Sequence, residues 1–216
     1  MKTKERILLT SLDLFNRYGE PAVTTNHIAD EMEISPGNLY YHYRNKEDIL
    51  LCLYERFEEA LLEALKAPEP EAVKLENMWL FLHLIFENIW HYRFFYRDLD
   101  HILSKSEKIK RRYSRVLLKK IDTAKLLCTG LSERGILVAS ASEIDALSHN
   151  MALTASYWLN FQSALQKSPQ DELSAKDISL GVYQVMALIA PYLRDEERGM
   201  LQSLSRVYLG DTLSNG

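Results

Sequence analysis

The sequence has no excess of basic residues, and this limits how it can contact nucleic acid. Its 26 Lys and Arg are outnumbered by 30 Asp and Glu, which gives a net charge of −4. The first fifty residues also hold fewer basic than acidic side chains, six against eight. A basic stripe is the usual electrostatic signature of DNA binding. Its absence excludes binding by bulk charge, so any DNA contact must depend on individually placed groups.

Turn-forming residues, cysteines and uninterrupted apolar runs are also scarce. Eight Gly and six Pro in 216 residues leave long stretches without a backbone break, which favours helices over a β-rich fold. Cys52 and Cys128 lie far apart and form no CxxC pair, as is typical of a reduced, cytoplasmic protein. The most apolar stretch, residues 79–96, contains charged and amide side chains. We therefore expect a soluble, cytoplasmic protein with no signal peptide and no membrane partner.

The apolar spacing predicts an all-α fold. A first helix carries Ile7 to Tyr18 and ends at Gly19, and a second is capped by Thr24 or Thr25. A third begins at Ser35-Pro36, and a fourth runs from Asn45 to about Lys66. Later helices are expected over residues 71–91, 95–103, 107–133, 142–166, 175–190 and 196–209. This predicts a three-helix DNA-binding domain at 1–46, a linking helix at 46–66 and a larger helical ligand-binding and dimerisation domain at 67–216.

Two short helices joined by a tight turn form the arrangement of a helix-turn-helix. Ile28, Ala29, Ile34, Leu39 and Tyr43 can share one small core between them. Polar and aromatic side chains then remain on the outer face of the second helix. The sequence therefore predicts a double-stranded operator DNA partner.

The outer face offers groups that suit a phosphate backbone read at a groove. Hydroxyls of threonine and tyrosine and the histidine ring donate to phosphate, and Lys46 adds a point charge. Gly37 allows close backbone approach, and the Asn38 amide can pair with adenine. The predicted DNA-binding residues are Thr25, Ser35, Pro36, Gly37, Asn38, Tyr40, Tyr41, His42 and Lys46.

The order of residues in this region resembles the TetR family of bacterial regulators. The resemblance rests on Thr24-Thr25-x-x-Ile28-Ala29, on Ile34 through Tyr43, and on Asn45 through Leu50. It implies a homodimer with a divergent helical C-terminal domain that usually binds a small ligand. By position it implies DNA contacts, mostly to phosphate, from Thr25, Ser35, Gly37, Tyr40, Tyr41, His42 and Lys46. Two departures are Met32-Glu33, where a small residue and Gly are usual, and Tyr43, where Phe is commoner.

Aromatic side chains after residue 78 are candidates for a ligand pocket, because pockets are mainly apolar with a few polar groups. The predicted pocket residues are Trp79, His83, Phe86, Glu87, Trp90, Phe94, Tyr157 and Trp158. His83, Glu87 and His91 share one helical face and could ligate a metal. The neighbouring tryptophans favour a packed or pocket-lining helix instead, so we expect no metal and no cofactor.

The resemblance to TetR regulators also implies that the two late helices meet those of a second copy as a four-helix dimer interface. Their apolar residues are Ile144, Leu147, Met151, Ala155, Trp158 and Leu159 on one helix and Ile178, Val182, Val185, Met186 and Ile189 on the next. Two-fold symmetry would match a palindromic operator. The basic run from Lys105 to Lys120 is interpreted as a solvated helix face, with a position near DNA as the alternative.

Three functions fit these patterns to different degrees. The first is a ligand-responsive repressor, with an unidentified small-molecule effector that shifts the fourth helix. The second is a constitutive DNA-binding protein that recruits a partner. The third, an enzyme using His83, Glu87 and His91, has no supporting catalytic motif, so we expect no enzymatic activity.

Overall fold

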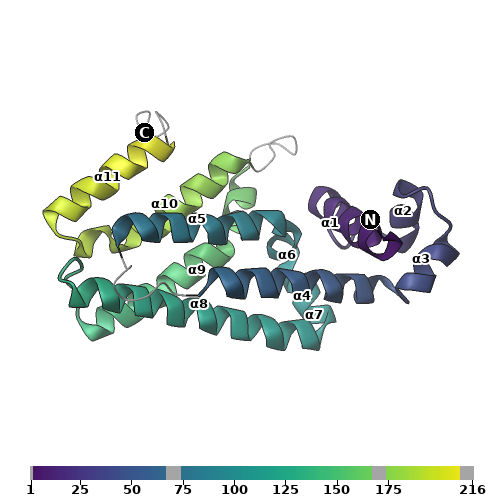
Figure 1. Ribbon diagram of the computed structural model, residues 1–216, viewed down its shortest axis with the longest axis horizontal. Helices are drawn as coiled ribbons and strands as arrows, with labels where there is room; N and C mark the ends of the chain where they lie inside the picture. Colours follow the sequence, from purple (N-terminus) through teal and green to yellow (C-terminus); the bar gives the residue numbers. More distant parts are fainter. Residues whose placement is uncertain (1, 67–73, 167–173, 210–216) are drawn as a thin grey trace.

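The computed structural model describes residues 2–66, 74–166 and 174–209 (Figure 1). These residues are almost entirely helical, which confirms the all-α prediction. The helices are α1 Thr3–Tyr18, α2 Thr25–Glu31, α3 Pro36–His42, α4 Lys46–Ala64, α5 Leu75–His91, α6 Arg93–Arg97, α7 Leu99–Lys105, α8 Glu107–Glu133, α9 Ala141–Leu165, α10 Ala175–Ile189 and α11 Asp195–Leu209. None of the helices in the described ranges is long and apolar enough to cross a bilayer.

Most helix boundaries lie within two residues of the predicted ones. The α8 helix spans the predicted 107–133, and α9 begins one residue earlier than expected because Ser140 and Glu143 form a capping box there. The single helix predicted at 95–103 is instead two short helices, α6 and α7, which meet at Asp98. The predicted start at 71 lies outside the described residues, and α5 begins at Leu75.

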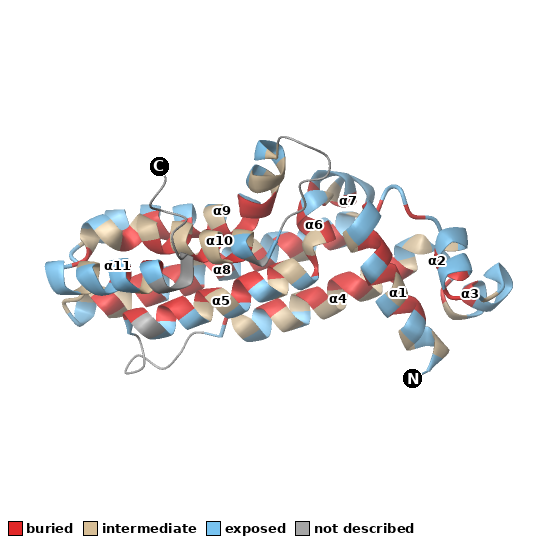
Figure 2. Ribbon diagram, turned by 90° about the horizontal axis from the view of Figure 1, so that it is seen from above, coloured by how far each residue is buried: buried red, intermediate tan, exposed pale blue. Residues whose placement is uncertain are grey.

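The first three helices form a small unit at one end of the molecule (Figure 1). Ile7 and Phe15 of α1, Ile28 of α2 and Leu39 of α3 are fully buried and form its core. Tyr18 lies at the end of α1 and is 60% exposed. The exposed residues of α3 lie on the outer side of the unit (Figure 2).

The α4 helix belongs to both parts of the molecule. Its first turn lies beside α1 to α3, and its later turns pack against α5 and α8 in the helical bundle (Figure 1). Nineteen residues at the rise of an α-helix span about 28 Å. A displacement at one end of α4 is therefore carried to the other by one rigid element.

The bundle of α5, α8, α9 and α10 holds the larger part of the hydrophobic core, which is continuous with the core of the first three helices; buried residues are red in Figure 2. The packing around Gly181 of α10 is close. A Cβ atom there would lie 2.4 Å from Cε1 of Phe86 and 2.6 Å from Cδ1 of Trp158. Phe86 and Trp158 therefore fill the space between α5, α9 and α10.

The residues predicted to form the dimer interface are instead core residues of the single chain. All those named on α9 and α10, from Ile144 to Ile189, are less than 9% exposed. They are buried because α9 packs against both α8 and α10. A different set of apolar side chains on α9 is exposed, at intervals of four residues. This α9 stripe consists of Leu153, Tyr157, Phe161 and Leu165.

Candidate DNA-binding surface and its link to the bundle

The two short helices of the predicted motif are each fixed by a side-chain cap. Thr24 Oγ1 accepts a hydrogen bond from the backbone N–H of His27, and Ser35 Oγ accepts one from Asn38. The turn between them contains Glu33 with a φ of 55°, in the left-handed region that favours glycine. The departure seen in the sequence at Glu33 therefore leaves the turn intact but places a non-glycine residue in a strained conformation.

The outer face of α3 is open to solvent. Tyr41 is 85% exposed and Tyr40 is 46% exposed, while Leu39 between the two helices is fully buried. A Cβ atom at Gly37 would meet only Ser35 Oγ, at 3.9 Å, so packing within this chain does not require glycine there. Ser35, Pro36, Gly37 and Asn38 are likewise exposed at the start of α3.

Two of the predicted contact residues are already joined to each other. The hydroxyls of Thr25 in α2 and Tyr40 in α3 lie 2.9 Å apart, which ties the start of α2 to the exposed face of α3. His42 is partly buried at the end of α3, and its ring meets that of Tyr41 edge to face at 5.1 Å. The structure thus gathers Thr25, Tyr40, Tyr41 and His42 on one surface.

Lys46 has a different environment from the one expected for a free phosphate donor. Its ammonium group lies 2.9 Å from the carbonyl of Glu20, 3.0 Å from that of Val23 and 2.8 Å from the Glu20 carboxylate. Three acceptors therefore occupy its three hydrogens. Lys46 therefore holds the start of α4 against the loop between α1 and α2.

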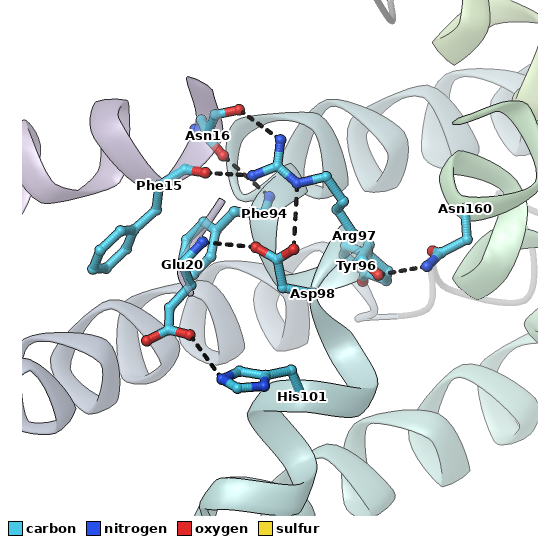
Figure 3. A network of polar contacts seen from close by, with 9 residues as sticks. All are labelled: Phe15, Asn16, Glu20, Phe94, Tyr96, Arg97, Asp98, His101 and Asn160. Atoms are coloured by element: carbon cyan, nitrogen blue, oxygen red, sulfur yellow. Dashed lines mark hydrogen bonds and ion pairs between the residues drawn. The ribbon is translucent and has the colours of Figure 1, made fainter. Parts of the chain in front are cut away.

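That loop is also held by α6 and α7, through contacts shown in Figure 3. Arg97 donates to the carbonyls of Phe15 and Asn16 at the end of α1, at 2.6 and 3.2 Å. Asp98 accepts from the backbone N–H of Glu20 at 2.8 Å. We call these residues, Asn16, Glu20, Arg97 and Asp98, the α1–α6 junction.

The junction extends in both directions. The Asn16 side chain accepts from the N–H of Phe94 and donates to the carbonyl of His91. On the bundle side, Asn160 of α9 donates to the carbonyl of Tyr96 at 2.7 Å (Figure 3). The short α6 helix therefore connects the end of α1 directly to α9.

Ion pairs join α4 to its neighbours along its length. Arg56 of α4 pairs with Glu5 of α1, and this hydrogen bond lowers the pKa of the Glu5 carboxyl. Arg112 of α8 contacts Glu55 and Glu58 of α4. These pairs fix α4 against both the unit formed by α1 to α3 and the bundle.

A cavity of about 30 Å³ lies inside the bundle. It is lined by Leu65, Phe81, Leu82, Ile85, Lys120, Thr123, Ala124, Leu127, Met151, Ala152, Ala155 and Val185. The walls thus come from α5, α8, α9, α10 and the residue that ends α4, where the Thr123 hydroxyl donates to the carbonyl of Leu65. A movement of the walls would act directly on the end of α4.

None of the eight predicted pocket residues lines this cavity. Trp79, Phe86, Phe94 and Trp158 are packed in the core, and Phe94 stacks against Phe15 of α1 with ring centres 5.2 Å apart. Tyr157 and Glu87 are exposed, Trp90 lies against the Arg93 guanidinium, and His83 pairs with Glu87. Most of the predicted residues share α5 and α9 with the cavity, but the cavity is lined by other residues of these helices.

The possible metal site of His83, Glu87 and His91 is not assembled. His83 Nε2 lies 3.5 Å from the Glu87 carboxylate, while the His91 ring packs edge to face on Tyr92. Within residues 2–66, 74–166 and 174–209, no group of three or more potential ligands is placed to hold a metal ion.

Sequence reasoning missed Lys120. It was assigned to a solvated face with the other basic residues of α8, but its side chain is 4% exposed. The signal was present, because Lys120 follows Tyr113 by seven residues and Val116 by four, which places it on their buried face.

Comparison with known protein families finds a match for the N-terminal part of the chain and another for the C-terminal part. Residues 7–53 match the family model described as bacterial regulatory proteins, tetR family, and residues 56–201 match that described as bacterial transcriptional repressor. A TetR-family transcriptional regulator from Marinobacter aquaeolei has a crystal structure with a TM-score of 0.86 and 35% identity. The alignment covers 96% of this chain and 99% of that one.

Two curated relatives match over short parts of this chain. The regulator QacR of Staphylococcus aureus is 43% identical over 51 residues, and the uncharacterized regulator YerO of Bacillus subtilis is 44% identical over 54. These alignments cover 24% and 25% of this chain and 27% and 19% of those proteins. The family models and the full-length structural likeness together show that this chain belongs to the TetR family of bacterial transcriptional regulators.

Proposed function

We propose that this protein binds operator DNA as a homodimer through α2 and α3, and that a small molecule entering the bundle weakens this binding. The exposed face of α3 carries the proposal. Its tyrosines are exposed to solvent, and packing within the chain does not require the glycine at position 37. Contacts of this kind position a helix on the phosphate backbone without a large positive charge.

The dimer is assigned to the α9 stripe. Leu153, Phe161 and Leu165 are each more than half exposed and lie on one line along the helix. Exposed apolar stripes of this kind mark surfaces that a partner covers. A two-fold partner on this stripe would present two copies of α3, which suits a palindromic operator with half-sites about one helical turn apart or a multiple of it.

Two mechanical links support ligand response. One is α4, whose last turn adjoins the cavity wall at Leu65 and whose first residue, Lys46, holds the loop after α1. The other is the α1–α6 junction. A ligand shifts the position of α3 only by the difference between its affinities for the two arrangements.

The small cavity volume favours the second hypothesis, constitutive DNA binding without an effector, because the walls must separate before a ligand enters. In that case no ligand that binds the bundle would alter operator affinity.

The test of DNA binding is fluorescence anisotropy with fragments from upstream of the protein's own gene, over a series of salt concentrations. We expect affinity to fall as salt rises, because phosphate contacts release counterions. Tyr41→Phe should weaken binding about tenfold, since it removes one hydrogen bond to a charged group. Tyr18→Phe is the matched control, since it also removes an exposed phenol hydroxyl from the same unit.

Equal affinities of the wild type and Tyr41→Phe would exclude the α3 face as the contact surface. Loss of binding in Tyr18→Phe alone would place the surface at the end of α1 instead.

A further inference from the structure

Lys120 is a cation enclosed in the bundle with only neutral neighbours. Its ammonium group donates to Ser156 Oγ at 2.9 Å and to the Tyr96 hydroxyl at 3.3 Å, and it lies 5.2 Å from the centre of the Tyr96 ring. Among the described residues, no carboxylate lies within ion-pair distance of it, and its third hydrogen has no acceptor. When the amine is protonated, its charge is therefore uncompensated within this part of the chain.

The other inward-facing cation of α8 shows the usual arrangement. Arg112 is held by two carboxylates, those of Glu55 and Glu58. A buried charge without such a partner is costly. Burial accordingly lowers the pKa of Lys120 to about 7, and no neighbouring charge opposes the shift. An anion bound beside Lys120 would offset the cost of burying its charge.

Lys120 lines the cavity, and the rest of the lining determines what accompanies the anion. Leucine, isoleucine, valine, phenylalanine and methionine side chains form most of the wall, and the Thr123 hydroxyl is already bonded to Leu65. Such a wall suits hydrocarbon. Phe81 is partly exposed at its edge, and Met151 is an unbranched side chain that adapts to new contacts.

We propose that the effector is a monoanionic amphiphile, whose carboxylate pairs with Lys120 and whose hydrocarbon chain widens the apolar cavity between α5, α8, α9 and α10. This inference rests on the proposed function in taking the bundle as the effector site. One buried cation matches one negative charge. The apolar lining excludes a highly polar anion such as inorganic phosphate.

The position of Lys120 also connects such a ligand to DNA binding. Tyr96, which accepts from Lys120, is followed by Arg97, which donates to the carbonyls at the end of α1 (Figure 3). A carboxylate that draws the ammonium away from Tyr96 changes the contacts of α6. The α1–α6 junction transmits this change to the DNA-binding unit.

The experiment compares decanoate with decanol, which has the same chain and no charge, by calorimetry in the absence of DNA. Octanoate and laurate test the chain length. Three proteins are used: the wild type, Lys120→Met and Lys119→Met, the last being a control because Lys119 is the exposed neighbour on the same helix. Operator affinity is measured separately by anisotropy with and without decanoate.

The wild type and Lys119→Met should bind decanoate about tenfold more tightly than decanol, because a hydrogen-bonded ion pair is lost with the alcohol. Lys120→Met should lose the preference for decanoate and bind decanol at least as tightly, because an unpaired buried carboxylate is costly. Decanoate should also weaken operator binding by the wild type but not by Lys120→Met.

Equal affinity of the wild type for decanoate and decanol would overturn the proposal. The same holds if no carboxylate of the series binds, or if Lys120→Met keeps the preference for the anion. Failure to bind any DNA fragment would count against the proposed function alone, since the calorimetric comparison is made without DNA.

Discussion

The amine of Lys120 is buried in the bundle, where the surrounding helices supply only neutral partners. The groups within hydrogen-bond distance of its amine are Tyr96 from α6 and Ser156 from α9. Its pKa is about 7 in the folded protein, against 10.5 ordinarily. Between these two values the unfolded chain binds a proton that the folded chain does not.

Raising the pH through this window therefore stabilises the fold, and the effect is absent below about pH 7. Compared with Lys120→Met, the wild type should gain about 1.4 kcal/mol of unfolding free energy per pH unit from pH 7 towards pH 10. Urea denaturation of both proteins at several pH values measures this difference, in which other titrating groups cancel. Parallel pH profiles for the two proteins would show that Lys120 stays protonated in the fold.

At the scale of helices, the packing of α10 against α5 and α9 depends on the absence of a Cβ atom at Gly181. Gly181 lets the rings of Phe86 and Trp158 approach its backbone, whereas Gly199 of α11 has no atom within 4 Å of a built Cβ. Both glycines lie inside helices, where alanine is intrinsically favoured. The two positions therefore separate helix propensity from packing.

Gly181→Ala should lower the unfolding free energy by about 1–3 kcal/mol, because the added methyl group forces two aromatic rings apart. Gly199→Ala should raise it by about 0.5–1 kcal/mol. Urea denaturation midpoints give both values. Stabilisation by both substitutions would mean that the α5–α9–α10 contact is looser than the structure indicates.

Over the whole molecule, the α9 stripe is the surface assigned to the second copy of the chain. Phe161→Arg places a charge in the middle of that surface and should weaken dimerisation about a hundredfold. Light scattering over a range of protein concentrations measures the mass, and anisotropy measures the accompanying loss of operator affinity.

Leu118→Arg is the control for the dimer surface. Leu118 is 61% exposed on α8, comparable with 56% for Phe161, so both substitutions replace an exposed apolar side chain by the same cation. Dissociation caused by Leu118→Arg, with Phe161→Arg still dimeric, would move the interface from α9 to α8.

The local pattern of the sequence was sufficient for the helix-turn-helix and for most of the helices, though not for the division of residues 93–105 into α6 and α7. The Ser35 cap and the spacing of Ile28, Ala29 and Leu39 involve residues close together in the sequence. They can therefore be recognised without knowledge of the rest of the fold. The resemblance to TetR regulators rested on the same short segment. The exposed face of α3 follows from the same spacing.

The tertiary structure alone decided which side chains of each later helix meet. Apolar residues surround much of α9, so its periodicity did not distinguish the core residues from the α9 stripe. Lys46 and Lys120 both acquire their partners from segments more than twenty residues away. Long-range contacts of this kind depend on how the helices pack, and for that reason the cavity, its buried cation and the α1–α6 junction emerged only from the fold.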